Sequence, residues 1–366
     1  MRIDHVHFYV EDAIASRDWF VNQLNFQAVA GGANHTCTQV VKNNSVYFVL
    51  SSPLTSLSPV ADFLRQHPPG VADIAFCVED VEAVMQKAIA HGAKVLQPIQ
   101  QKSCLKWSKI AAWGSLTHTL IERQEIPPCP PEARGGGEQE NSYYPLLAEH
   151  LKPYPPVAAI NTFTGIDHVV LNVATGDLER AVAWYQNTLD FHSQQSFKIQ
   201  TERSALHSQV MVSPNSSVQF PINQPASPNS QIQEFLDVNR GSGIQHIALQ
   251  TLNIVSAIAQ FRSQGLSFLP VPPSYYTQLQ ERQIPLSADQ LAEIAQQQIL
   301  VDWQDTNPQA LLLQTFTQPI FGQPTFFFEL IERRAQAPGF GEGNFRALFE
   351  AIEREQIKRG SLHDFD

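Results

Sequence analysis

The sequence predicts an α+β fold of two domains, each a pair of βαβββ modules whose mostly antiparallel strands curl into an open barrel with the helices outside. Two observations predict it. Short segments of the first half recur in the same order in the second half, and repeats of this length indicate two domains of one fold. Within each half, the pattern of a strand, a helix and further strands occurs twice.

The repeat consists of three ordered matches, and the offset between them grows because the second copy carries insertions. The matching segments, with offsets of 163, 173 and 210 residues, are 3–6 with 166–169, 74–75 with 247–248, and 120–123 with 330–333. A proline-rich stretch with a run of three glycines separates the copies and breaks any regular element, as a surface linker does. We therefore expect a first domain over residues 1–126, a linker over 127–160 and a second domain over 161–366.

Individual elements follow from local patterns. Residues 3–10 alternate weakly, as a strand does, and residues 13–24 carry apolar side chains at helical spacing. In the second copy, Ser287 is expected to cap an inserted helix, and residues 299–303 and 310–316 predict a hairpin.

The C-terminal segment predicts an amphipathic helix for which Asn344 is the expected N-cap. Apolar side chains follow at positions i, i+3, i+4 and i+7: Phe345, Leu348, Phe349 and Ile352. Two interpretations remain open, because this stripe can pack into the core or close the mouth of a cavity. The preceding residues 339–343 lack the strand-to-helix context of a phosphate-binding loop, so we interpret them as a hinge or a loop leading into the helix.

Composition restricts the class of function. A net charge of -11 and the absence of a Lys/Arg cluster argue against a nucleic-acid partner, so we expect small-molecule partners. The four cysteines form no C-x-x-C pair and all lie in the first half, which predicts a reducing compartment. No stretch reaches about 18 consecutive apolar residues, and the chain begins at once with a strand, so we expect no membrane span and a cytoplasmic location.

One apolar, β-type run, over residues 324–333, carries the carboxylate Glu329. A carboxylate buried without a partner costs several kcal/mol, so a cationic group is expected to face it. Two other apolar strands each carry one histidine, His168 and His246. Two imidazoles and one carboxylate, with open positions left over, are the ligand set of a mononuclear non-haem Fe(II) site.

The first copy of the repeat provides an internal control. At the three equivalent positions it carries His5, Asp73 and Thr119, and a neutral threonine is a poor replacement for a carboxylate ligand. We therefore predict that the first copy binds no catalytic metal. A single histidine is more often a surface or hydrogen-bonded core residue than a ligand. The two histidines of the second copy begin equivalent strands of one domain, and we interpret them together as ligands.

Strand parity favours Glu329 over Glu332 as the ligand. Side chains alternate along a strand, so these two carboxylates, three positions apart, face opposite ways. We expect Glu332 to be structural or solvent-facing. By the same alternation, Phe327 shares the cavity face with Glu329, whereas Phe326 and Phe328 pack into the core.

These residues resemble the 4-hydroxyphenylpyruvate dioxygenase family of the vicinal-oxygen-chelate, or glyoxalase-like, superfamily of paired βαβββ modules. The resemblance covers the second domain nearly throughout and the first domain loosely. The segments that carry it, in the family's order, are 167–168, 243–249, 272–276, 312–317, 327–329 and 339–349.

The resemblance implies an Fe(II) enzyme that converts 4-hydroxyphenylpyruvate and O2 to homogentisate and CO2, in tyrosine catabolism or in quinone and tocopherol synthesis. It makes His168, His246 and Glu329 the iron ligands and assigns catalytic roles also to Gln245 and Gln314. It also implies a homo-oligomer, a dimer or a tetramer. The substrate-binding residues it implies are Ser208, Asn223, Gln245, Gln314, Phe316, Phe327, Phe340, Asn344, Phe345, Leu348 and Phe349.

Three alternatives stay open. A 4-hydroxymandelate synthase would share fold, iron and substrate but oxidise the benzylic carbon; we favour homogentisate because of residues 221–223 and 344–345. A metal-free member of the superfamily could sequester a small aromatic compound. A nickel or zinc isomerase, or an extradiol ring-cleaving enzyme, is the third alternative.

Overall fold

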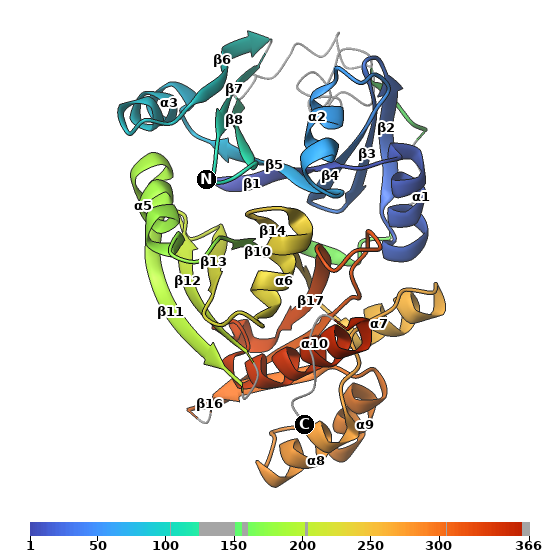
Figure 1. Cartoon of the computed structure of the whole chain (residues 1–366). Helices are drawn as coiled ribbons and strands as arrows, with labels where there is room; N and C mark the ends of the chain where they lie inside the picture. Colours follow the sequence, from blue (N-terminus) through green and yellow to red (C-terminus); the bar gives the residue numbers. More distant parts are fainter. Residues whose placement is uncertain (103, 124–150, 156–159, 202–203, 305, 361–366) are drawn as a thin grey trace, which may run out of the picture.

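The computed structural model describes residues 1–102, 104–123, 151–155, 160–201, 204–304 and 306–360. Within this part of the chain two large sheets form, one of nine strands and one of eight, with helices packed around them (Figure 1). The predicted α+β fold of two sheet-based domains is confirmed. The predicted linker over residues 127–160 lies largely outside the described residues, so the domain boundaries stay predictions.

The first sheet has the strand order β6-β7-β8-β5-β1-β4-β3-β2-β9. Its strands are β1 (Arg2–Tyr9), β2 (Gln27–Ala33), β3 (Thr36–Asn43), β4 (Val46–Pro53), β5 (Gly70–Val78), β6 (Val95–Lys102), β7 (Leu105–Ala111), β8 (Thr117–Arg123) and β9 (Lys152–Pro153). The short strand β9 comes from the expected linker region and pairs with β2.

The second sheet has the strand order β11-β12-β13-β10-β14-β17-β16-β15. Its strands are β10 (Phe163–Asn172), β11 (His192–Gln200), β12 (Ala205–Val212), β13 (Gln219–Pro225), β14 (Gly243–Thr251), β15 (Leu300–Gln304), β16 (Asn307–Phe316) and β17 (Phe327–Arg333). The predicted hairpin is therefore formed by β15 and β16, which pair antiparallel.

The helices connect these strands. They are α1 (Ala13–Leu24), α2 (Pro59–Gln66), α3 (Val81–Ala90), α5 (Leu178–Leu189), α6 (Gln231–Asn239), α7 (Ile254–Ser263), α8 (Pro273–Glu281), α9 (Ala288–Gln296), the 3-10 turns η3 (Arg334–Gln336) and η4 (Glu342–Asn344), and α10 (Phe345–Arg359). No helix in the described ranges is long and apolar enough to cross a lipid bilayer.

The pairing of the strands explains the repeat. In each sheet the first strand of one module pairs antiparallel with the first strand of the other, β1 with β5 and β10 with β14. Each of these strands also pairs in parallel with the last strand of its own module, for example β10 with β13 and β14 with β17. Both halves therefore consist of two βαβββ units that meet at a central antiparallel pair.

Helix caps show where sequence patterns translate into contacts. Ser287 begins α9 with a full capping box, since its hydroxyl accepts the backbone N–H of Gln290 while the Gln290 side chain accepts the N–H of Ser287. Asn344 stands at the N-cap position of α10, as predicted, but its side chain makes no capping hydrogen bond and bonds to Tyr275 and Gln314 instead.

An aromatic cluster joins the two sheets. The ring centroids of Phe8 and Phe326 are 5.1 Å apart, and Phe328 stacks on Phe48 at 5.7 Å. All four rings are at most 1% exposed. The strand that carries Glu329 therefore packs its other face against the first domain, as strand parity predicts.

Candidate metal centre

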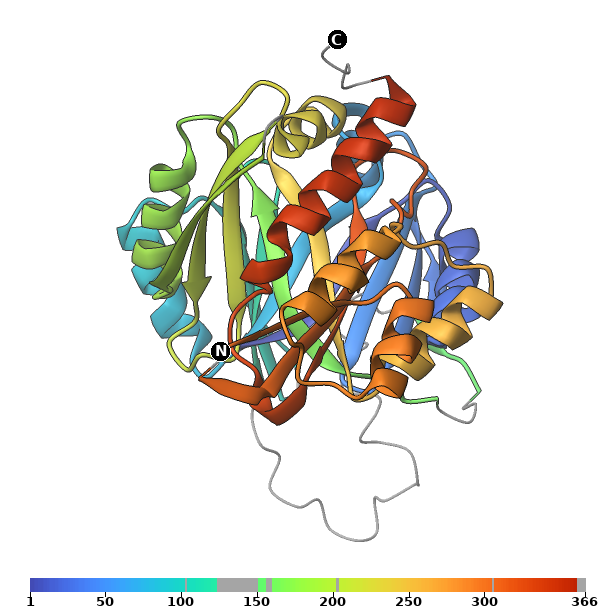
Figure 2. The same ribbon diagram turned by 90° about the horizontal axis from the view of Figure 1, so that it is seen from below.

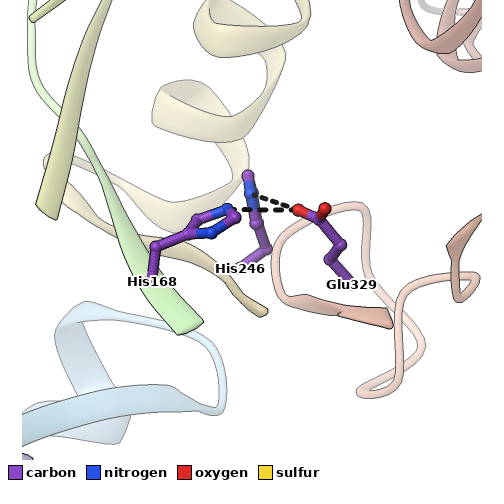
Figure 3. A group of neighbouring side chains, drawn as sticks. All are labelled: His168, His246 and Glu329. Carbon is purple, nitrogen blue, oxygen red and sulfur yellow. Dashed lines mark ion pairs between the residues drawn. The ribbon is translucent and has the colours of Figure 1, made fainter. Parts of the chain in front are cut away.

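The structure brings His168, His246 and Glu329 together in the second sheet (Figure 3). His168 Nε2 lies 3.2 Å and His246 Nε2 lies 3.7 Å from the same carboxylate atom, Glu329 Oε2. All three residues are buried, with exposed fractions of 3%, 9% and 2% in that order. The potential ligand atoms lie within 4.8 Å of one another, which suits a single metal ion.

The register of three neighbouring strands produces this cluster. His168 on β10 lies opposite Ala248 on β14, and Ala248 lies beside Glu329 on β17. His246 is two residues from Ala248, so it shares the same face of β14. The three side chains therefore project from adjacent strands on one side of the sheet.

Hydrogen bonds fix the ring nitrogen that each histidine presents. His168 Nδ1 donates to Asp167 Oδ1 at 2.9 Å, and His246 Nδ1 faces the acceptor Gln245 Oε1 at 3.2 Å. With both Nδ1 atoms committed to these partners, the Nε2 atoms of both rings face the Glu329 carboxylate and are the nitrogen atoms available to a metal ion. This is the arrangement in which outer hydrogen-bond partners orient metal-binding histidines.

Asp167 is itself held by Arg333. Nε and Nη2 of Arg333 donate to the two carboxylate oxygens at 2.7 and 2.8 Å, while Nη1 donates to the carbonyls of Ala337 and Gly339. Burial alone would raise the pKa of Asp167, but its bonds to Arg333 and His168 hold that pKa well below its usual range. One guanidinium thus links a histidine of the cluster to the loop that leads into α10.

The electrostatics of the cluster favour a bound cation. Burial would lower the pKa of His168, but the charges of Glu329 and Asp167 raise it to about 9. Burial lowers the pKa of His246 well below its ordinary value. Glu329 Oε1 is buried and has no hydrogen-bond partner among the described residues. A buried carboxylate with an unpaired oxygen, facing two imidazole nitrogens, fits a divalent metal ion.

A cavity of about 620 Å³ opens in front of the cluster. Ten of the residues expected to bind substrate line it: Ser208, Asn223, Gln245, Gln314, Phe316, Phe327, Phe340, Phe345, Leu348 and Phe349. The other residues of the lining were not among the expected substrate contacts: Val170, Phe197, Ile199, Leu206, Val210, Pro221, Gln231, Ile232 and Ile352. Many of these alternate along β11 and β12, so strand period could have identified them once those strands were assigned to the cavity wall.

Asn344 is the exception among the expected substrate contacts, since it is not part of the cavity lining. Its side chain accepts a hydrogen bond from the Tyr275 hydroxyl at 2.7 Å and reaches Gln314 Oε1 with its amide nitrogen at 3.4 Å. The residue is 1% exposed and lies behind Gln314. It therefore supports the amide that lines the cavity instead of lining the cavity itself.

The stripe on α10 faces the cavity, and the helix lies across the second sheet (Figure 2). Phe340, just before the helix, sets its ring edge-on to His168 with centroids 5.2 Å apart. Farther along, the buried Glu353 accepts hydrogen bonds from the hydroxyls of Thr201 and Ser204. Residues 339–343 lead into the helix through η4, so the interpretation as a loop before a helix is confirmed.

The first domain keeps part of this arrangement but not the full set of potential ligands. Asp4 again pairs with a histidine, His5, at 2.9 Å and with Arg123 at 2.7 Å. At the position equivalent to His246, however, Asp73 pairs with the ammonium group of Lys109 at 3.4 Å. No second cluster of His, Cys, Asp or Glu that could hold a metal occurs in the part of the chain that the structure describes.

Glu332 and its counterpart Glu122 have matching structural roles. Glu332 Oε2 accepts the N–H of Ile254 at the start of α7, and Glu122 Oε2 accepts that of Val81 at the start of α3. Carboxylates are stabilising at helix N-termini. Glu332 therefore faces away from the cluster, as strand parity predicts.

Comparison with known proteins adds independent information. Residues 4–104 and 165–284 each match the Glyoxalase/Bleomycin resistance protein/Dioxygenase superfamily. The chain is 37% identical to 4-hydroxyphenylpyruvate dioxygenase of Yarrowia lipolytica, with 98% of this chain and 93% of that one covered. It is also 37% identical to the Dictyostelium discoideum enzyme of that name, with 98% and 99% covered. A solved triple mutant of 4-hydroxymandelate synthase from Streptomyces coelicolor aligns with a TM-score of 0.83 at 25% identity, covering 97% of this chain and 98% of that one.

Paired βαβββ modules and one buried His/His/Glu cluster define a member of the glyoxalase and dioxygenase superfamily with a metal-capable site in its second domain. Identity of 35% to 37% over 98% of the chain then specifies the group within it. The chain belongs to the 4-hydroxyphenylpyruvate dioxygenase family.

Proposed function

We propose that this chain is an Fe(II)-dependent dioxygenase that converts 4-hydroxyphenylpyruvate and O2 to homogentisate and CO2. The observation that carries the proposal is the buried cluster of His168, His246 and Glu329 at the wall of an aromatic cavity. Relatives of that name, similar over nearly the whole chain, support the choice of substrate.

Iron is proposed from the donor set. Two neutral imidazoles and one carboxylate suit a non-haem Fe(II) with open positions, whereas structural zinc sites are usually closed by four protein ligands. When bound, Fe(II) supplies a common attachment point for the 2-oxo acid and O2, together with electrons for O2 reduction. His168, His246 and Glu329 would hold it, with Glu329 contributing the only ligand charge.

The remaining cavity residues bind and orient the substrate. Gln245, Gln314, Ser208 and Asn223 provide neutral hydrogen-bonding groups, which can hold a phenol without placing another charge near the metal. Gln245 Oε1 already accepts from His246, so its amide N–H groups remain available to substrate. We propose that Gln245 thereby aligns substrate and ligand together.

Phenylalanines exclude water from the reacting groups. Phe316, Phe327 and Phe340 line the cavity beside the cluster, and Phe345 and Phe349 line it from α10. A site that reduces O2 needs such walls because reactive species would otherwise oxidise solvent or protein. We propose that α10 acts as the lid of this cavity.

The 4-hydroxymandelate synthase alternative rests on a close structural match. That match has 25% identity, whereas the dioxygenases of two other organisms reach 37%. We therefore favour homogentisate as the product.

One experiment tests the proposal. The purified chain, given Fe(II), 4-hydroxyphenylpyruvate and O2, should consume O2 and release CO2 and homogentisate in equal amounts. Hydroxymandelate as the product would replace the proposal with the alternative. Tight binding of the aromatic acid without iron and without O2 consumption would support the metal-free binding protein.

We propose a cytoplasmic homo-oligomer, a dimer or a tetramer, which light scattering on the purified chain tests. We propose domains over residues 1–126 and 161–366, which limited proteolysis tests through cleavage between them. The product would enter tyrosine catabolism or quinone and tocopherol synthesis.

A further inference from the structure

A second cavity, of about 850 Å³, lies between α8 and α10. Its lining residues come from both helices and the segments beside them: Pro272, Ser274, Tyr275, Gln278, Leu279, Arg282, Gly343, Ala347, Glu350 and Arg354. On α10, Ala347, Glu350 and Arg354 follow helical spacing and lie on a different face from the stripe that lines the metal cavity. Figure 2 shows α8 and α10 side by side.

Two guanidinium groups line this cavity. Arg282, at the C-terminal end of α8, stacks on Trp303 with its central carbon 4.4 Å from the ring centroid, which holds the side chain in place. Arg354 comes from α10. One of its terminal nitrogens, Nη2, is shielded from solvent and has no hydrogen-bond partner among the described residues.

Glu350, one helical turn before Arg354, also lines the cavity, and Arg354 Nη2 still has no hydrogen-bond partner among the described residues. A guanidinium nitrogen that has lost water without gaining an acceptor is costly. An anion in the cavity would supply that acceptor, and Ser274 and Gln278 add neutral hydrogen-bonding groups.

We propose that this cavity is a binding site for a small phosphate or carboxylate anion, bridging Arg282 and Arg354. Arginine suits such anions because its planar guanidinium presents paired donors to two oxygens. Because the two arginines belong to different elements, the bound anion ties α10 to α8. The proposed function makes α10 the lid of the metal cavity. If it is, the bound anion favours the closed state of that cavity.

The test measures binding in the absence of substrate, so it is independent of dioxygenase activity. Inorganic phosphate is titrated into the purified full chain by calorimetry at constant ionic strength, with NaCl as the reference and succinate as a competitor. We expect phosphate to bind and to raise the melting temperature. If succinate displaces phosphate, the site binds both anion classes. If succinate does not displace phosphate, the site is specific for phosphate. If succinate alone binds, the site is a carboxylate site.

Variants separate the site from general charge effects. Arg354→Gln is expected to weaken binding at least tenfold, and Arg282→Gln is expected to weaken it as well. The control Lys358→Gln removes a cation from the same helix, where Lys358 pairs with Glu355 outside the cavity, and should leave binding unchanged. Equal phosphate affinity in the parent chain and both arginine variants, or no anion binding by the parent chain, would overturn the proposal. Failure of the dioxygenase assay with intact anion binding would overturn only the proposed function.

Discussion

Replacing Arg333 by lysine tests whether the loop before α10 and the metal cluster share one support. The guanidinium uses three nitrogens, two on Asp167 and one on the carbonyls of Ala337 and Gly339. A lysine keeps the charge but has one nitrogen at the end of a flexible chain. It cannot hold Asp167 in a bidentate pair and bind the loop at the same time.

The magnitude follows from the bonds lost. Arg333 is largely buried, with a side chain 12% exposed, so water replaces its contacts poorly. Losing one bond to a carboxylate and two to carbonyls is expected to cost about 2–4 kcal/mol in the free energy of unfolding. Since Asp167 would no longer hold His168 rigidly, metal affinity should fall by about 10- to 100-fold.

The repeat supplies a matched control. Arg123→Lys disturbs the corresponding pair in the first domain, where Asp4 holds His5 but no ligand cluster follows. Co(II) titration followed by visible absorption, with urea unfolding, measures both variants. We expect both to lose stability but only Arg333→Lys to lose metal affinity. Equal metal affinity in the two variants would refute the reasoning.

Under the proposed function, Glu329→Gln removes the only ligand charge, so this variant should lose most activity and metal affinity; full turnover of it would show that Glu329 is not a ligand. Gly341→Ala would place a Cβ 1.8 Å from Gln314 Oε1 at a backbone φ of +77°, so kcat/KM should fall at least tenfold, and an unchanged value would contradict the close approach. Burial lowers the pKa of His118 from 6.5 to about 4 in the folded chain. Below pH 6.5 the unfolded chain therefore binds more protons at this residue than the folded chain does, so the folded state loses stability as the pH falls. The contribution of His118 to this loss in the free energy of unfolding is about 2 kcal/mol at pH 5. His118→Gln should reduce the difference in unfolding free energy between pH 7 and pH 5 by that amount, as urea unfolding at the two pH values would reveal.

The sequence predicted the fold well because its signals are local and duplicated. Apolar spacing predicts the helix over residues 13–24 at its observed bounds, and the structure adds Asp12 as its capping acceptor. The repeat alone predicts that His168 and His246 lie on equivalent strands, because each of the two strands carries one histidine. The order of strands in the sheets depends on long-range pairing, which no local pattern contains.

The sequence predicted the three clustered side chains of the candidate site, but not the hydrogen bonds that hold them in place. Asp167 and Arg333 lie in repeated segments, where Asp4 and Arg123 are their counterparts. The repeat alone does not show that the two residues of each pair form a hydrogen bond across the sheet. Asn344 was expected among the substrate contacts, and the structure places its side chain on Tyr275 and Gln314, outside the cavity lining, which the sequence position does not reveal. Its partner Tyr275 lies 69 residues earlier in the chain, and only the folded structure reveals that hydrogen bond.

The aromatic contact between the sheets gives the first half a structural role in supporting the second. After a duplication, one copy could exchange a ligand for threonine and admit a lysine ammonium without harm, provided that its phenylalanines continued to support the strand behind Glu329. In such a half, the buried phenylalanines are the residues whose size and packing must be kept. An isolated second half would lose the contacts of Phe326 and Phe328 with Phe8 and Phe48, so the strand that carries Glu329 depends on the first half for part of its cover.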